Sequence, residues 1–153
     1  MLHFAYGSNM SRLLMGRRCP TAVALGTARL AGWRFIIMGG GYASVAPSPG
    51  DEVHGVLWRL APRDLAALNA YESLDTGLYR RRMLAVTYDG GRVPALTYLA
   101  RDRSEGRPKP GYQDIVVKAA REWKLPEAYV RALERWAPSG HSGARSAETG
   151  ELA

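Results

Sequence analysis

The sequence is poor in cysteine, and its single thiol limits the chemistry that sulfur could perform. Cys19 has no second cysteine within the 153 residues, so an intrachain disulfide is excluded. Proline follows it directly, and no histidine stands nearby in the sequence to act as its base. We therefore expect a buried or inert thiol rather than a catalytic nucleophile.

A long uncharged hydrophobic run is also missing. The most apolar stretch, residues 22–38, is interrupted by Arg29, Arg34 and several glycines, so it falls short of the ~20 apolar residues that span a membrane. The first residues carry neither the basic region nor the small-residue cleavage site of a secretory signal. These absences predict a protein that crosses no membrane and resides in the cytoplasm.

Acidic residues are few: 14 stand against 21 basic residues, which gives a formal net charge of +7. Of the basic residues 18 are arginine, but they are scattered, and residues 80–82 form the one run. No aromatic and basic repeat accompanies that run, so nucleic acid is the last-ranked partner. We expect most arginines to lie on a solvated or ion-paired surface.

The sequence does contain enough apolar material for one core. Hydrophobic residues make up 46% of the chain and charged residues 23%, which is typical of a globular protein. Length and composition predict one domain over residues 1–138. Residues 139–153 are rich in Ser, Gly and Ala and carry no apolar stripe, which predicts a disordered tail.

Hydrophobic periodicity predicts mostly strands in the first two thirds of the chain and helices at the end. Strands are expected within residues 2–6, 21–38, 42–46, 53–60, 79–88 and 92–100, and helices within 10–16, 62–72, 110–124 and 126–137. A turn is expected at residues 47–51, and Asp89-Gly90-Gly91 is typical of a hairpin turn. This order favours the α+β class with a strongly bent or closed sheet.

The first candidate site is Tyr6-Gly7-Ser8-Asn9, where a strand ends in a turn and a helix begins. The first N–H groups of a helix lack helical partners and can bind an anion, and Gly7 would let a ligand approach the backbone. Ser8, Asn9 or Ser11 could cap the helix or orient a carboxylate. A plain capped turn explains the same residues, and spacing alone favours it. Nucleotide binding is not expected, because no phosphate-loop lysine follows.

The second candidate is Glu72, at the end of the predicted helix over residues 62–72. Leu65, Leu68 and Glu72 are spaced i, i+3 and i+7, which places the carboxylate on the apolar stripe of the helix. Burial and the negative end of the helix dipole would both raise its pKa, as a general base requires. The alternative is a frayed helix end with Glu72 in water or paired with one of residues 80–82, which would lower its pKa.

Histidine is scarce, and its positions argue against a metal site. His3, His54 and His141 have no metal-ligand spacing with one another or with Cys19. No metal ion is therefore expected.

Together, these segments resemble the gamma-glutamylcyclotransferase (AIG2-like) family. The resemblance covers residues 2–137. It is carried by Tyr6-Gly7-Ser8-Asn9-Met10, residues 43–53, Gly55-Val56-Leu57-Trp58, Asn69-Ala70-Tyr71-Glu72, Gly77-Leu78-Tyr79, Pro110-Gly111-Tyr112 and residues 125–129. It implies a small mixed β-barrel with surrounding helices, and no cofactor.

The implied activity is intramolecular aminolysis, in which a γ-glutamyl compound closes to 5-oxoproline and expels the attached amine. The resemblance assigns proton transfer to Glu72 and binding of the γ-glutamyl group to Tyr6, Gly7, Ser8 and Asn9, with Tyr79 and Tyr112 lining the cavity. The partner is then a small γ-glutamyl substrate. A noncatalytic binding module on the same fold is the alternative.

Two segments depart from the family pattern. His54 stands where a bulkier aromatic residue often occurs, and Arg80-Arg81-Arg82 replaces a mainly apolar strand start. The leaving amine therefore stays open among an amino acid, a biogenic amine, a lysine side chain and a protected biosynthetic intermediate. Whole glutathione is less favoured, because the glutathione-degrading branch has different loop sequences.

Overall fold

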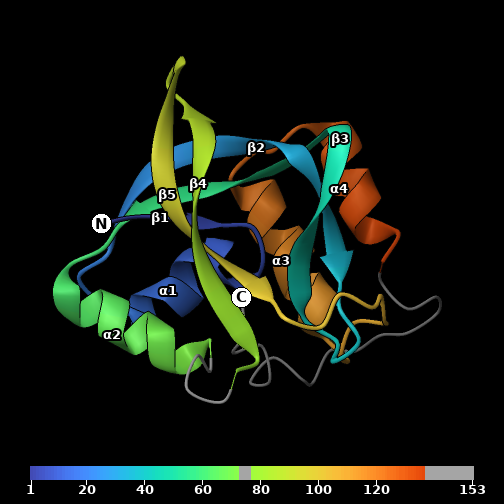
Figure 1. Ribbon diagram of the computed structural model, residues 1–153, viewed down its shortest axis with the longest axis horizontal. Helices are drawn as coiled ribbons and strands as arrows, with labels where there is room; N and C mark the ends of the chain where they lie inside the picture. The colour runs from blue at the N-terminus through green and yellow to red at the C-terminus, as the bar shows by residue number, and fades with distance from the viewer. Residues whose placement is uncertain (73–76, 137–153) are drawn as a thin grey trace.

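Five strands within the described residues close into a barrel, seen with its helices in Figure 1. The computed structural model describes residues 1–72 and 77–136. The strands are β1 (Leu2–Ala5), β2 (Val23–Ile37), β3 (Ala43–Arg59), β4 (Tyr79–Tyr88) and β5 (Gly91–Ala100). Their order around the barrel is β1-β3-β2-β4-β5, and β1 runs parallel to β5 while the other neighbours are antiparallel. The predicted mixed barrel in the α+β class is confirmed.

The two longest strands, β2 and β3, form most of one wall. A turn at residues 47–51 was expected to separate two strands, and this prediction is wrong, because β3 runs on from Ala43 to Arg59. The partner of Ala31 is Glu52, whereas the partner of Trp33 is Pro47, so the residues between Pro47 and Glu52 lie outside the ladder. Gly50 allows this bulge through its φ of 89°. The turn-forming residues therefore shift the register without ending the strand.

The hairpin between β4 and β5 follows its sequence signal. Tyr88 pairs with Gly91 across the two-residue loop Asp89-Gly90. The φ values of Asp89 and Gly90 are 50° and 80°, the left-handed pair that a tight hairpin turn needs. The predicted hairpin is confirmed.

In the described part of the chain, four α-helices and a short 3-10 turn surround the barrel. They are η1 (Ser8–Met10), α1 (Arg12–Arg18), α2 (Pro62–Tyr71), α3 (Tyr112–Glu122) and α4 (Glu127–Glu134). In Figure 1, α1 and α2 lie beside each other near one end of the barrel, and α3 and α4 lie behind β2 and β3. The predicted helices are confirmed, although α1 begins at Arg12 after η1 rather than at residue 10.

The start of α2 is fixed by a buried carboxylate. Asp64 accepts hydrogen bonds from the Ala61 N–H at 2.9 Å and from the Thr21 hydroxyl at 2.7 Å. Burial alone would raise the pKa of Asp64, but the bonds from Thr21 and Ala61 outweigh it and lower the pKa. Asp64 thus caps α2 and ties it to the segment before β2, which sets the position of the residues at the far end of the helix.

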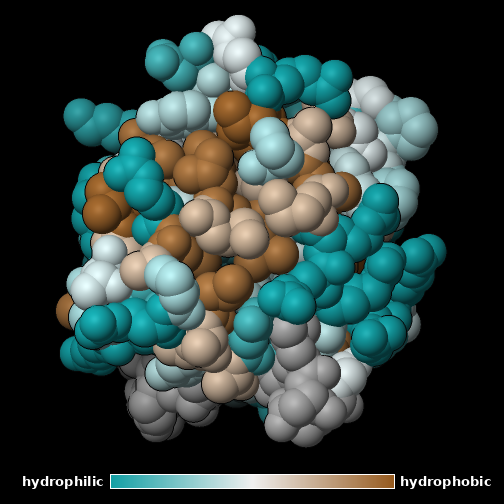
Figure 2. Space-filling view, turned by 60° about the vertical axis from the view of Figure 1, so that its left-hand side comes forward, coloured by the Kyte–Doolittle hydropathy of each residue, from teal (hydrophilic) through white to brown (hydrophobic). Residues whose placement is uncertain are grey.

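The surface is uneven in polarity. Figure 2 shows hydrophobic residues gathered in the middle of the face that lies to the left in Figure 1, with hydrophilic residues around them. Arg29, Arg34, Arg121 and Arg131 form ion pairs with glutamates, as expected for part of the arginine surplus. Within residues 1–72 and 77–136, none of the helices has the length and hydrophobicity to cross a membrane.

Candidate functional site

The Tyr6-Gly7-Ser8-Asn9 segment leaves β1 and turns at once into η1. The Gly7 carbonyl accepts a hydrogen bond from the Met10 N–H at 3.0 Å, which closes the turn. Ser11, not Ser8 or Asn9, caps α1, since its hydroxyl accepts from the Leu14 N–H at 3.2 Å. Ser8 and Asn9 are buried. Their side chains are therefore turned inward, away from the capping role that was one alternative.

Glu72 ends α2 with a fully buried side chain. The alternative of a frayed helix end with this carboxylate in water is therefore wrong. The Asn9 amide nitrogen, Nδ2, donates a hydrogen bond to Glu72 Oε2 at 3.1 Å. The two candidate motifs, 63 residues apart in the sequence, thus meet at one contact.

Arg18, at the end of α1, was missed as a site residue. It is buried, and its Nη1 donates to Ser8 Oγ at 3.0 Å and to Asn9 Oδ1. Its guanidinium carbon lies 4.6 Å from the ring centroid of Tyr71. Because Arg18 is a donor, it fixes the carbonyl side of the Asn9 amide, so the NH₂ side faces Glu72.

Three tyrosines lie around this contact, and each of their hydroxyls forms a hydrogen bond with a backbone group. Tyr6 donates to the Tyr98 carbonyl at 2.5 Å, and Tyr79 donates to the Ala43 carbonyl at 2.7 Å. The Tyr112 hydroxyl accepts from the Ala43 N–H at 3.2 Å. Tyr79 and Tyr112 therefore hold one residue of β3 through both of its backbone groups.

The negative charge of Glu72 affects the pKa of all three tyrosines. Burial is the main cause that raises the pKa of Tyr6, Tyr79 and Tyr112, and the Glu72 carboxylate raises each further. Hydrogen bonds from the backbone of Ala43 and Ser8 lower the pKa of Tyr112 without cancelling the rise. All three phenols stay protonated at neutral pH, so they shape and polarise the site rather than act as bases.

A shallow pocket without room for a whole water molecule lies beside Glu72. Its walls are His3, Phe4, Ala5, Tyr6, Asn9, Glu72 and Tyr98. Of the residues proposed from the sequence, Tyr6, Asn9 and Glu72 line this space. Gly7, Ser8, Tyr79 and Tyr112 are not among the lining residues, and the hydroxyls of Tyr79 and Tyr112 contact Ala43.

His3 also lines this pocket. From the sequence it was considered only as a metal ligand, and that role was not expected. Its Nδ1 lies 3.0 Å from the Leu96 carbonyl, so this nitrogen carries the proton and donates. Nε2 is then an acceptor, and it is buried without a hydrogen-bond partner among residues 1–72 and 77–136. Burial lowers the pKa of His3 to about 4, so the ring is neutral at pH 7.

Cys19 does not line the pocket beside Glu72. Cys19 is buried and its thiol donates to the Asp64 carbonyl at 3.4 Å, while burial raises its pKa to about 11. The prediction of a buried thiol is confirmed. In the part of the chain that the structure describes, no three His, Cys, Asp or Glu side chains come together closely enough to hold a metal ion.

Comparisons with known proteins connect this geometry to a family. Residues 52–133 match the model of the AIG2-like family. The gamma-glutamylcyclotransferases of Mus musculus and Homo sapiens are each 30% identical to the chain over 162 residues, covering 99% of this chain and 86% of theirs. A solved structure named gamma-glutamyl cyclotransferase has a TM-score of 0.86 at 30% identity, over 97% of this chain and 94% of that chain. The full-length alignments include both the turn at residues 6–9 and Glu72.

Proposed function

The chain belongs to the AIG2-like, gamma-glutamylcyclotransferase family of enzymes, and from this premise we propose that it converts a γ-glutamyl amino acid or amine to 5-oxoproline and a free amine. The observation that carries the proposal is the buried contact between Asn9 and Glu72, because it joins a carboxylate to the turn that would hold the substrate. The reaction would take place in the cytoplasm, on a small molecule, and without a nucleic-acid partner.

The reaction forms one bond and breaks one bond within the same substrate. The α-amino nitrogen attacks the γ-carbonyl carbon to close a five-membered lactam, and the amide bond to the leaving amine breaks. One proton must leave the α-ammonium group, and one must reach the departing nitrogen. Water is not consumed, and no cofactor takes part. The reacting atoms are already linked, so the protein has to fold the substrate and move the protons.

Glu72 is the group proposed to move these protons. The reference pKa values of a glutamic acid and an α-amino group are about 4.3 and about 8, so the transfer is uphill by ~5 kcal/mol in water. Removing the carboxylate from water disfavours its charged form and narrows that gap. The complete burial of Glu72 acts in this direction, whereas the bond from Asn9 acts against it and holds the carboxylate in place.

The turn at residues 6–9 is proposed to bind the γ-glutamyl group through its backbone N–H groups. Gly7 carries no side chain to obstruct a ligand there, and the neighbouring Tyr6 ring lines the cavity. Arg18 adds a buried positive charge next to Ser8 and Asn9, which favours an anionic guest. Neutral Tyr79 and Tyr112 keep β3 in position behind the site.

The test is to identify both products. The protein is incubated with a panel of γ-glutamyl amino acids and amines in isotope-labelled water, and products are quantified by mass spectrometry. Cyclisation gives equal amounts of unlabelled 5-oxoproline and amine. Labelled glutamate would indicate hydrolysis and contradict the proposal. Binding of the panel with no turnover would favour the noncatalytic module.

A further inference from the structure

His3 carries a buried hydrogen-bond acceptor that has no donor, and it does so at the pocket beside Glu72. Among the described residues, four buried side-chain atoms have no hydrogen-bond partner: Nε2 of His3, Nε1 of Trp58, Oε1 of Gln113 and the hydroxyl of Tyr129. Of these four residues, His3 alone lines the pocket that Glu72 lines. Because leaving a buried acceptor unpaired costs free energy, the unpaired nitrogen of His3 calls for a physical explanation.

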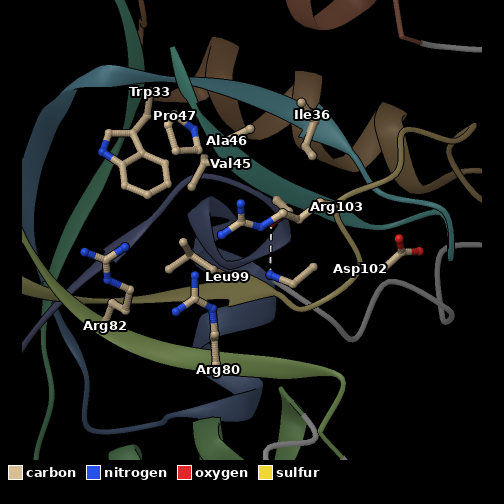
Figure 3. Close-up of a pocket in the computed structure, with 12 residues that line it drawn as sticks. Trp33, Ile36, Val45, Ala46, Pro47, Arg80, Arg82, Leu99, Asp102 and Arg103 are labelled. Atoms are coloured by element: carbon tan, nitrogen blue, oxygen red, sulfur yellow. Dashed lines mark hydrogen bonds between the residues drawn. The ribbon is translucent and has the colours of Figure 1, made fainter. Parts of the chain in front are cut away.

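The pocket between β2 and β4 offers a contrast (Figure 3). Its volume is about 40 Å³. There the Ser44 hydroxyl accepts a hydrogen bond from the Ala100 N–H at 2.9 Å, drawn as the dashed line in Figure 3. The guanidinium carbon of Arg82 lies 5.8 Å from the centroid of the Trp33 ring. Ser44 and Arg82 therefore have partners within that pocket, whereas Nε2 of His3 has none in its own.

The orientation of the His3 ring is fixed by two contacts. Nδ1 donates to the Leu96 carbonyl of the neighbouring strand β5 at 3.0 Å. The ring also meets the Tyr98 ring edge-on, with 5.5 Å between the centroids. Turning the ring over would break the bond to Leu96, so Nε2 stays on the side away from that carbonyl. At neutral pH this nitrogen carries no proton, because burial lowers the pKa of His3 to about 4.

The side-chain donors that line the pocket are already engaged elsewhere. The Tyr6 hydroxyl donates to the Tyr98 carbonyl, and the Tyr98 hydroxyl donates to Asn69 Oδ1 at 2.6 Å. The Asn9 amide donates to Glu72 and forms no bond with the imidazole. Water cannot serve as the donor, because the pocket has no room for a whole water molecule.

Glu72 is the lining residue whose capacity to donate changes during the proposed reaction. As a carboxylate it is an acceptor only, so it forms no hydrogen bond with the unprotonated Nε2 of His3. After it has taken the proton of the α-ammonium group, it carries an O–H and becomes a donor. The lack of a partner for Nε2 is therefore the arrangement expected before proton transfer.

We propose that His3 is a positioning residue for this proton transfer: once Glu72 holds the proton, its O–H donates to Nε2 of His3. This inference rests on the proposed function. Asn9 donates to the carboxylate form of Glu72, and His3 accepts from the acid form, so each form has its own partner. A hydrogen bond to the acid form favours that form, which makes it easier for Glu72 to take the proton. The proton stays on Glu72 until the departing nitrogen receives it.

Two substitutions of His3 separate the two nitrogens of its ring. Glutamine brings an amide oxygen to the place of Nε2, whereas asparagine reaches only the place of Nδ1, where it can keep the bond to the Leu96 carbonyl. We expect kcat for 5-oxoproline release to fall about tenfold in His3→Asn with KM changed by less than about twofold, and to stay within about threefold of the wild type in His3→Gln. A merely structural role predicts the reverse order, since His3→Asn keeps the contact with β5.

These kinetics decide the inference separately from the function on which it rests. Equal kcat values in the two variants, a lower kcat in His3→Gln, or a change confined to KM overturns the inference while the proposed function stands. If the wild type releases no 5-oxoproline from any γ-glutamyl substrate, the proposed function fails, and the role of His3 in it fails as well. Unfolding curves verify that both variants are folded.

A second measurement needs no turnover. Glutamine at position 72 presents an N–H where protonated Glu72 would present its O–H, so Glu72→Gln imitates the acid form. In ¹⁵N NMR spectra of histidine-labelled protein at neutral pH, the Nε2 signal of His3 should move in Glu72→Gln toward the position of a hydrogen-bonded acceptor. Glu72→Met removes the same charge without supplying an N–H, so it is the matched control and should leave the signal near its wild-type position. The same Nε2 signal in Glu72→Gln and Glu72→Met overturns the inference.

Discussion

Replacement of Arg18 by methionine tests how the site is held together. Methionine keeps an unbranched stem of similar length but removes the guanidinium group. The change deletes the bonds from Nη1 to Ser8 Oγ and Asn9 Oδ1 and the contact with the Tyr71 ring. Hydrogen bonds to a charged group contribute about 1.5–3 kcal/mol each, and such terms do not simply add. We expect the free energy of unfolding to fall by about 2–4 kcal/mol, because two buried acceptors lose a charged donor.

The same substitution should also reduce activity. Without Arg18, the Asn9 carbonyl loses its donor, and the amide that contacts Glu72 is held less firmly in place. We expect kcat to fall by roughly 10- to 100-fold, since the carboxylate loses its fixed position. Guanidinium chloride unfolding and the 5-oxoproline assay measure the two effects. Arg17→Met is the matched control, because Arg17 is exposed in the same turn of α1 and should matter by less than about 0.5 kcal/mol. An Arg18→Met protein with wild-type stability and wild-type kcat would refute the reasoning.

Two further predictions concern the strand that leads into the site. The pKa of His3 is about 4 in the folded protein and 6.5 in the unfolded chain, so the unfolded state binds more protons between these values. The free energy of unfolding should therefore be highest above pH 6.5 and fall by on the order of 3 kcal/mol as the pH drops to 4. In His3→Phe, the free energy of unfolding should change less with pH over this range. The same pH dependence in the variant and the wild type would contradict the prediction. Gly55→Ala would place its Cβ 2.2 Å from the Ala5 carbonyl oxygen, so we expect a loss of about 3 kcal/mol or more, with reduced activity because β1 must shift. Gly16→Ala, which meets nothing within 4 Å in α1, should instead raise the melting temperature, and equal effects of the two substitutions would rule out the steric explanation.

Local sequence signals predicted much of the fold of this protein. The spacing of Leu65, Leu68 and Glu72 placed the carboxylate on the inner face of its helix, and the structure buries it there. Asp89-Gly90 predicted a two-residue hairpin loop, because few other residues accept two successive positive φ angles. In both cases a physical requirement acts within a few residues of the signal.

The contacts that complete the site depend on residues far apart in the sequence. Arg18 stands three residues after the buried Met15, so helical spacing could have placed it on the inner face, but its partners Ser8 and Asn9 could not be read from that spacing. The turn predicted at residues 47–51 was wrong for a similar reason. Its residues favour a turn, and only the continued pairing of β3 with β2 on both sides shows that the strand does not end.

The orientation of the arginine side chains at residues 80–82 could not be predicted from the sequence either. Alternation along β4 states that Arg80 and Arg82 share a face and that Arg81 does not, but it cannot state which face points inward. Buried residues lie on both faces of β4, Leu84 and Val86 on one and Tyr79 on the other, so burial along the strand does not settle the choice. Sequence reasoning therefore recognised the departure from the family pattern without predicting where these side chains point.

The claim on which the account depends is that Glu72 transfers the protons of the cyclisation. The most direct measurement is kcat for 5-oxoproline release by Glu72→Gln beside the wild type, with unfolding curves for both. Glutamine keeps the shape of the side chain and an oxygen that can accept from Asn9, but it cannot take up a proton. The account predicts a fall in kcat of about 10²- to 10⁴-fold in a protein that remains folded. A folded Glu72→Gln protein with wild-type turnover would contradict it.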